Sequence, residues 1–364
     1  MRTTKWYRLF GVCFVCLLTL SCRQLTTPDI RRIDGSAPVE TTLWFGMGKS
    51  VIGIDADNDQ LVTAYVMKSH ALYCMGASVD SIGRIYTAIP MVSGNVWGSF
   101  LVRISTSGTV DRTYSVNPNP TDPFVINDLV FSGSANLYSS GFAFSITDIN
   151  SGEHIFDSQS LRSSSHIRRL FRAGDVAYLV FGANPAKSWE TQFLVVDTVK
   201  KNWRWEKEMA ADLKTEALLF PILLGGRLYT ISQLTHRLYV HEFPSMKRVA
   251  LINTDSAYGT HPHSDATGDF DLYCFFATDT ELVFQCGKDG PEKGDRITYI
   301  IDPDTLLLKR AIPPLGNDFR FSHIMDTYKN KLYFHLYPPS GGDACAVVDS
   351  LTGSVLATIP FPVE

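Results

Sequence analysis

The sequence predicts an all-β fold, a β-propeller of seven blades with about four antiparallel strands each. Two recurring patterns with one common period lead to this prediction. The first pattern is an apolar strand, an acidic or small polar residue, a short turn that often ends in Gly, and a second apolar strand. Its polar residue recurs at Asp55, Ser105, Asp148, Asp197, Glu242, Asp302 and Asp349. The spacings are 50, 43, 49, 45, 60 and 47 residues, close to the period of about 40 to 50 residues typical of propeller blades.

The second pattern is a turn residue followed by an apolar and an aromatic residue, and it precedes six of the seven polar positions. Its aromatic residues are Tyr86, Tyr138, Tyr178, Tyr229, Phe284 and Tyr333. Gly, Asn and Asp in the turns tolerate positive φ, and the β-branched and aromatic residues suit strands. Asp55 lacks a clear upstream partner, so the first unit is expected to be incomplete, with residues 43–45 supplying its missing strand.

Residues 1–21 are predicted to be a signal peptide. Arg2, Lys5 and Arg8 precede an apolar run over residues 10–20, which is shorter than the roughly 20 residues that span a bilayer. Residues 18–22, Leu-Thr-Leu-Ser-Cys, resemble the lipobox of bacterial lipoproteins. The resemblance implies cleavage before Cys22 and acyl chains on that residue, two or three of which anchor a protein firmly. The alternative is an ordinary cleaved secretory signal.

After the lipidated Cys22, the segment 22–40 is expected to be a flexible tether, since it carries Thr, Ser, Pro and Gly. Residues 41–364 then form a single propeller domain. The whole chain has a net charge of −4, and removing the basic residues of the signal peptide makes the remainder more acidic. Without a Lys/Arg cluster, this charge argues against nucleic acid as a partner.

The longest spacing, between Glu242 and Asp302, contains a polar cluster with a metal-binding pattern. His261, His263 and Asp265 offer imidazole and carboxylate ligands suited to zinc or another transition metal. The alternative is a solvated surface loop, and no other cofactor is expected.

Two further motifs are predicted to be structural. The alternating carboxylates of residues 55–59 suggest calcium, but Gln60 and Val66 replace the Gly and Glu that an EF-hand needs, so a plain turn is expected. Trp203 and Trp205 resemble the quinoprotein-type repeat, in which a Trp after the turn packs between blades. We expect packing there and no quinone.

Cys274 and Cys286 are predicted to be neighbours. Their flanking strands fold as a hairpin about Thr280, which sets the two cysteines directly opposite each other. Opposed Cα atoms are close enough for a disulfide. The alternative is two buried thiols.

With these motifs in hand, residues 41–364 resemble bacterial β-propellers of degenerate YVTN and quinoprotein-like repeats. Together with the lipobox-like end, the chain is similar to the propeller lipoproteins that assist outer-membrane protein assembly. The resemblance implies a membrane-anchored scaffold that binds a protein partner in the cell envelope, with its domain in the periplasm or at the cell surface.

The alternative function is that of a metal-dependent propeller hydrolase or lactonase. Such an enzyme holds a divalent metal in the central channel, and Asn127, Asp128 and Asp326 are the candidate ligands. The chain contains no G-x-S-x-G, H-E-x-x-H or P-loop motif. We therefore assign no catalytic residue and favour a protein that is not an enzyme.

Overall fold

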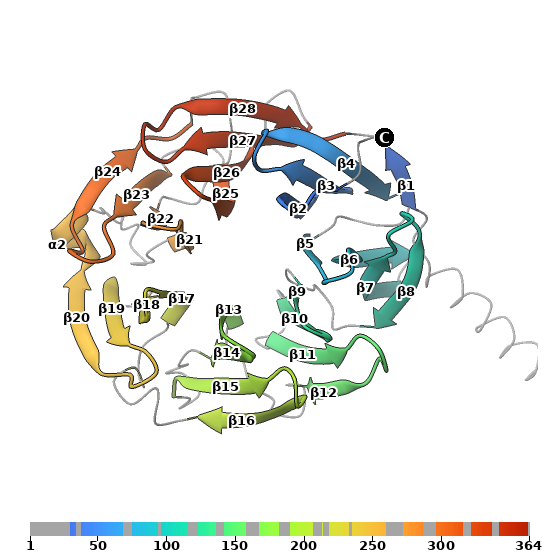
Figure 1. The fold of residues 1–364 in the computed structure, drawn as a ribbon, viewed down its shortest axis with the longest axis horizontal. Coiled ribbons are helices and arrows are strands. Elements are labelled where there is room, and N and C mark those ends of the chain that lie inside the picture. Colours follow the sequence, from blue (N-terminus) through green and yellow to red (C-terminus); the bar gives the residue numbers. More distant parts are fainter. Residues whose placement is uncertain are drawn as a thin grey trace, which may run out of the picture.

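Seven four-stranded antiparallel sheets surround a central axis in the computed structural model (Figure 1). It describes residues 30–33, 38–67, 75–93, 96–115, 123–135, 142–157, 167–181, 190–206, 213, 218–232, 235–259, 272–286, 296–315, 322–336 and 342–362. The predicted seven-bladed propeller is confirmed. The five-residue α2 (Thr254–Tyr258) follows blade 5, and no helix in the described ranges has the length and apolarity of a membrane span.

Each blade uses a contiguous part of the chain. Blade 1 contains β1 (Ile30–Ile33), β2 (Thr42–Met47), β3 (Ser50–Asp55) and β4 (Gln60–Met67). Blade 2 contains β5 (Met75–Val79), β6 (Ile85–Ser93), β7 (Val96–Ile104) and β8 (Val110–Ser115). Blade 3 contains β9 (Phe124–Ile126), β10 (Leu129–Ala135), β11 (Phe142–Asp148) and β12 (His154–Asp157). Blade 4 contains β13 (Ile167–Ala173), β14 (Val176–Phe181), β15 (Gln192–Asp197) and β16 (Asn202–Glu206).

The remaining blades follow in the same way. Blade 5 contains β17 (Leu218–Leu224), β18 (Arg227–Ser232), β19 (Arg237–Glu242) and β20 (Arg248–Asn253). Blade 6 contains β21 (Leu272–Ala277), β22 (Leu282–Cys286), β23 (Ile297–Ile301) and β24 (Leu308–Ile312). Blade 7 contains β25 (Ser322–Tyr328), β26 (Lys331–Leu336), β27 (Ala344–Asp349) and β28 (Val355–Pro360).

The core lies between the blades, so the middle strands are buried on both faces. Along β18, Leu228 enters the core between blades 4 and 5, whereas Tyr229 and Ile231 enter the core between blades 5 and 6. Successive side chains of a strand point to opposite faces of the sheet. A middle strand whose two faces are covered by the neighbouring blades therefore needs apolar residues at nearly every position. This explains the continuous apolar runs of the sequence.

Five of the seven repeated polar residues are aspartates, and each of these holds the turn that it begins. The Asp302 Oδ1 atom accepts hydrogen bonds from the backbone N–H groups of Asp304 (3.0 Å) and Thr305 (2.8 Å). The same side chain-to-backbone bonds form at Asp55, Asp148, Asp197 and Asp349. An aspartate that bonds its own turn in this way replaces backbone partners that the turn leaves unpaired.

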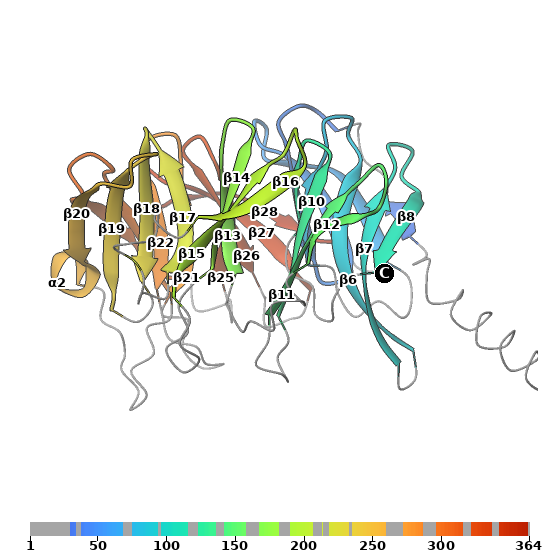
Figure 2. The ribbon, with the colours of Figure 1, turned by 90° about the horizontal axis from the view of Figure 1, so that it is seen from below.

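These turns lie together on one face of the disc, along the upper side of Figure 2. We call it the turn face and define it by the turns between the third and fourth strands. The turns comprise residues 55–60, 105–109, 148–153, 197–201, 242–247, 302–307 and 349–354.

Blade 1 departs from the other six, as the sequence predicted. The Tyr333 hydroxyl of blade 7 donates to the carbonyl of Ala56 (3.4 Å), as the Tyr229 hydroxyl of blade 5 donates to that of Pro303 (3.0 Å). Each carbonyl follows a repeated aspartate by one residue. The turn 55–60 is thus equivalent to the turns between the third and fourth strands of the other blades, although within the blade 1 sheet β2 is the innermost strand and β1 the outermost (Figure 1).

The fourth strand of the blade 1 sheet is β1, which pairs with the outer side of β4, Ile30 opposite Met67. Residues 30–33 fall within the predicted tether 22–40, so that prediction is wrong for these four residues. The four residues Ile30–Ile33 have two adjacent arginines between the isoleucines and show no strand-like alternation. Only the pairing with β4 identifies them as a strand.

The ring closes between blades 7 and 1, and among the described strands none is shared by the two ends of the chain. We call this boundary the seam. Its apolar part includes Ile52, Ile54, Tyr333 and Val347. Its polar part includes a hydrogen bond from the Ser50 hydroxyl to the carbonyl of Pro362 (2.9 Å). Side-chain packing and polar contacts therefore hold blade 7 against blade 1.

Candidate interaction surface

Exposed apolar side chains gather on the outer edge of blades 6 and 7. They come from the turn before β24, from β24 itself, from the turn after β27 and from β28. The exposed fractions are 68% for Leu307, 37% for Leu308, 51% for Leu351, 52% for Val355 and 50% for Leu356. We call these five residues the apolar rim patch. Large apolar groups gathered on a surface are typical of protein-binding sites.

The two halves of the patch are held side by side by contacts between the blades. The Arg310 guanidinium on β24 donates to the carbonyl of Ser350, the residue before Leu351. A Cβ added to Gly353 would lie 3.5 Å from two side-chain carbons of Ile312. The blade 7 turn thus rests directly on β24, the strand that begins with Leu308.

Two basic residues beside the patch, Lys309 and Arg310, form ion pairs with a buried carboxylate. The carboxylate of Glu281 is fully buried and lies 2.9 Å from the Lys309 amine and 2.5 Å from the Arg310 guanidinium. The Ser350 hydroxyl also donates to Glu281 (3.3 Å). The buried Glu281 charge requires such partners, so Lys309 and Arg310, with side chains 36% and 23% exposed, are each paired with it.

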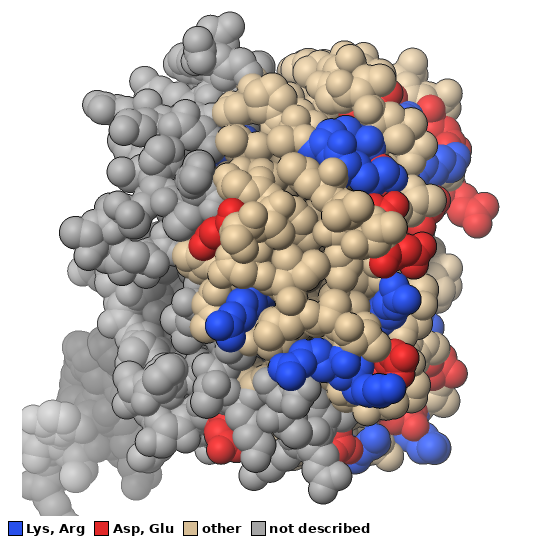
Figure 3. Space-filling model, turned by 90° about the vertical axis from the view of Figure 1, so that its left-hand side faces the viewer, with Lys and Arg blue, Asp and Glu red and all other residues tan. Residues whose placement is uncertain are grey.

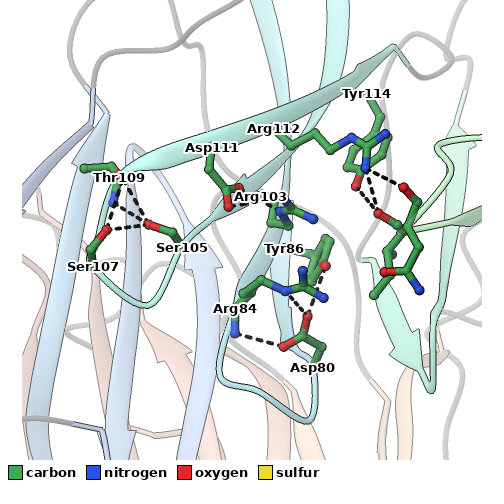
Figure 4. A network of polar contacts seen from close by, with 12 residues as sticks. Asp80, Arg84, Tyr86, Arg103, Ser105, Ser107, Thr109, Asp111, Arg112 and Tyr114 are labelled. Atoms are coloured by element: carbon green, nitrogen blue, oxygen red, sulfur yellow. Dashed lines mark hydrogen bonds and ion pairs between the residues drawn. The ribbon is translucent and has the colours of Figure 1, made fainter.

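On blade 2, charged side chains are likewise committed to contacts within the protein. Figure 4 shows the Asp80 carboxylate accepting from the Arg84 Nε atom (2.6 Å) and from the Tyr86 hydroxyl (3.1 Å). Next to them, Arg103 makes a two-point ion pair with Asp111 (2.7 and 3.1 Å). These arginines fix strands and turns.

The boundary between blades 2 and 3 uses another arginine in this way. The Arg112 guanidinium donates to the carbonyls of Ile149 (2.9 Å) and Asn150 (3.0 Å), and the Tyr114 hydroxyl donates to that of Ile149 (3.1 Å) (Figure 4). On the rim of blades 5 and 6, basic and acidic residues form small separate groups among uncharged ones (Figure 3). This mixed pattern of charge differs from the one-sign surfaces that bind nucleic acid.

Hydrogen bonds lower the pKa of two of the turn carboxyl groups, those of Asp302 and Asp57. Hydrogen bonds from the backbone N–H of Thr305 and from its side chain keep the pKa of Asp302 below its usual value, although burial opposes the shift. A hydrogen bond from the Lys329 amine does the same for the pKa of Asp57. A general acid needs a raised pKa near the working pH, so the arrangement of these groups fits a structural role.

The predicted turn at residues 55–59 is confirmed. Two of its carboxylates form ion pairs with lysines of blade 7. The Lys331 amine lies 2.8 Å from the Asp59 carboxylate, and the Lys329 amine lies 2.7 Å from that of Asp57. Both ion pairs cross the seam.

Two of the candidate ligands for a channel metal lie at the boundary between blades 3 and 4. The Asn127 side-chain amide donates to the Thr198 hydroxyl (2.7 Å), and the Asp128 carboxylate lies 3.7 Å from the Lys201 amine. Asp326 lies on β25 of blade 7, where its carboxylate accepts from the backbone N–H of Thr327 (2.8 Å). The structure therefore does not bring these three candidates together.

The other predicted sites remain predictions. Cys22, His261, His263 and Asp265 lie outside the described residues. Within the described residues, no group of three His, Cys, Asp or Glu side chains is arranged to hold a metal ion.

The predicted packing of the tryptophans between blades is confirmed. The Trp205 ring packs edge-on against Phe181 and Phe156, with ring centres 5.0 and 6.1 Å apart. The Trp203 ring contacts Phe156 at 5.0 Å, and its indole N–H donates to the carbonyl of Ile155 (2.9 Å). Both residues join blade 4 to blade 3.

The register predicted for the two cysteines is wrong. A β-bulge between Leu272 and Cys274 places Cys274 opposite Gln285 and Leu272 opposite Cys286. Cys274 therefore faces the core between blades 6 and 7, and Cys286 faces the core between blades 5 and 6. None of the described cysteines is in a disulfide, and oxidation of this pair stays a prediction for mass spectrometry of non-reduced peptides.

Sequence reasoning missed the apolar rim patch. Leu307, Leu308, Val355 and Leu356 look like the core residues of buried strands. The available signal was that residues 355–360 form the last strand of their unit and carry no charge, which is unusual for a strand at a sheet edge.

Comparison with known proteins supports the fold. No protein-family model and no curated protein matches the sequence. Among solved structures, the Cps50 (Swd1) β-propeller domain of Myceliophteria thermophila is similar with a TM-score of 0.55 at 10% identity, over 88% of this chain and 98% of that one.

Two further solved structures resemble the chain. The β-propeller domain of the Trilobed protease from Pyrococcus furiosus, described as having an open velcro topology, gives a TM-score of 0.50 at 13% identity, over 81% of this chain and 84% of that one. Dihydro-heme d1 dehydrogenase NirN in complex with DHE gives 0.51 at 13% identity, over 90% of this chain and 76% of that one. At these identities the likeness shows the propeller fold alone.

Proposed function

We propose that this protein is a protein-binding scaffold of the bacterial cell envelope, anchored to a membrane by lipid on Cys22. The observation that carries the proposal is the apolar rim patch, a group of exposed leucines and a valine on two adjacent blades. A rigid ring that offers an apolar surface is suited to hold a partner without chemistry of its own.

The lipobox-like segment 18–22 and the repeats support the location and the role. Acyl chains on Cys22 tie the chain to the membrane surface, and the propeller then works in the periplasm or at the cell surface. The resemblance to propeller lipoproteins supports a partner in outer-membrane protein assembly.

Site-specific photocrosslinking in intact envelopes tests the protein-binding role. A photoreactive amino acid replaces Leu351 in one variant and Val199 in another. Both residues are exposed and both follow a repeated aspartate by two positions, on blades 7 and 4. We expect a defined crosslinked protein from position 351 and much less from position 199. Equal crosslinking from both positions, or none from 351, would contradict the proposal.

The anchor is tested separately by replacing Cys22 with serine. We expect the wild-type chain to incorporate labelled palmitate and to sediment with membranes. The Cys22→Ser variant should lose both properties, and membrane association that survives without labelling would refute lipidation at this residue.

A further inference from the structure

The outer strand of blade 7 differs from every other outer strand in charge. The other six outer strands in the described part of the chain each carry at least one charged residue. Those residues are Arg31 and Arg32 on β1, Asp111 and Arg112 on β8, Asp157 on β12, Arg204 and Glu206 on β16, Arg248 on β20, and Lys309 and Arg310 on β24. β28, Val-Leu-Ala-Thr-Ile-Pro, has none. Charges on edge strands prevent the addition of another strand, so β28 lacks the usual protection.

The backbone of β28 presents hydrogen-bonding groups at this edge. The N–H of Phe361 donates to the carbonyl of Asp343 (2.8 Å), which sets the alternation of the ladder with β27. Residues 357 and 359 then bond inward, and Thr358 and Pro360 direct their backbone groups away from β27. The outward groups are the N–H and carbonyl of Thr358 and the carbonyl of Pro360, whereas Leu356 is the extra residue of a β-bulge. Pro360, which has no N–H, already occupies the last outward position.

The geometry of the edge favours an extended segment over a second copy of the ring. β28 is six residues long, about 20 Å at roughly 3.3 Å per residue. Two rigid discs that meet along this edge share a strip about one strand wide, whereas stable dimers bury about 1,200 to 2,000 Å². An extended chain can pair with β28 and also cover Leu351 and Leu307 beside it.

We propose that β28 accepts an extended, uncharged, apolar segment of a partner protein as a fifth strand of blade 7. Backbone hydrogen bonds to Thr358 and to the carbonyl of Pro360 supply the pairing, and the apolar rim patch receives the side chains of the segment. Segments of this kind are available in proteins that have not yet folded. The inference rests on the proposed protein-binding function and specifies its partner and its mode of binding.

The central variant is Thr358→Pro, which removes an outward N–H that no described strand pairs with. A proline is tolerated at such an edge position. Leu251→Pro on β20 is the matched control. Leu251 lies opposite Tyr239 as Thr358 lies opposite Ala346, and the two positions are equivalent relative to Glu242 and Asp349.

Binding is measured on the full-length protein with a fluorescent peptide of alternating valine and threonine, by fluorescence anisotropy. A second peptide, N-methylated at alternate residues, cannot form the ladder. We expect Thr358→Pro to weaken binding of the first peptide about tenfold, Leu251→Pro to leave it unchanged, and the N-methylated peptide not to bind. Unchanged melting temperatures of both variants show that they fold.

Several results would overturn the inference. These are equal binding by wild type and Thr358→Pro, equal loss in both proline variants, or binding of the N-methylated peptide. A dimer of the wild type that Thr358→Pro abolishes in sedimentation would assign the edge to a second copy, and binding to neutral phosphatidylcholine vesicles through it would assign it to lipid. Crosslinking from position 351 that persists in Thr358→Pro would retain the protein-binding function and reject strand addition.

Discussion

Replacing Lys331 by methionine should weaken the seam between the first and last blades. The Lys331 amine lies 2.8 Å from both carboxylate oxygens of Asp59 and 2.9 Å from the carbonyl of Ala56. The exposed fractions of the two side chains are 20% and 16%. Methionine keeps the apolar stem and removes the charge, so the substitution tests the ion pair itself.

The expected loss follows from this geometry. A hydrogen bond to a charged group contributes about 1.5 to 3 kcal/mol, and breaking a fully buried pair costs about 3 to 5 kcal/mol. Because the pair is partly exposed, we expect Lys331→Met to lower the free energy of unfolding by about 2 kcal/mol. For a domain of this size the melting temperature should fall by about 3 °C.

Lys329→Met is the matched control, since Lys329 pairs with Asp57 across the same seam. That pair is 59% and 46% exposed, and exposed pairs contribute about 0 to 1 kcal/mol. Urea and thermal unfolding, followed by circular dichroism, measure both variants. A double-mutant cycle with Asp59→Asn isolates the coupling. Equal losses in the two lysine variants, or no loss in Lys331→Met, would refute the role assigned to the buried pair.

Three further substitutions test other contacts. Gly46→Ala should cost about 3 kcal/mol, because the new Cβ would lie 2.1 Å from the carbonyl oxygen of Gly76; a urea midpoint equal to that of the wild type would contradict this close approach. Glu281→Gln should cost about 3 kcal/mol by removing the buried negative charge that pairs with Lys309 and Arg310, and thermal unfolding measures it. Burial opposes ionisation of Asp148, but the Lys201 amine and backbone N–H groups lower its pKa. The ionised Asp148 carboxylate thus contributes its full stabilisation above the unfolded pKa of about 3.9, and this stabilisation is lost as the pH falls through the lower pKa of the folded state. In Asp148→Asn the melting temperature should therefore fall less steeply below about pH 4 than in the wild type.

The number of blades could be predicted from the sequence because each blade depends on a local chemical requirement. A turn such as 302–307 leaves backbone N–H groups without strand partners, and the Asp302 carboxylate accepts from two of them. The residue that satisfies the turn must stand at a fixed place beside it, so it recurs once per blade. The incomplete first unit was visible for the same reason, since Asp55 had no hairpin before it.

The register and the exposed surface could not be predicted in this way. The bulge at Leu272–Cys274 inserts one residue into a ladder, and neither flanking strand contains a Gly or Pro that would indicate it. Val355 and Leu356 carry the same residue types as buried strands. They are exposed because β28 is the outer edge strand of its sheet, and the order of strands in a sheet cannot be read from residue types.

The seam also has a consequence for how the molecule folds. Among the described strand pairs, no ladder joins residues farther apart in sequence than Ile30 and Met67 of blade 1. Contacts between the two ends, such as Lys331 with Asp59 and Ser50 with Pro362, occur only where blade 7 meets blade 1. Each blade can therefore form from nearby residues, as in a linear repeat array. We therefore expect closure of the ring to be a separate and late step in folding, and we expect the folded disc to open first at the seam.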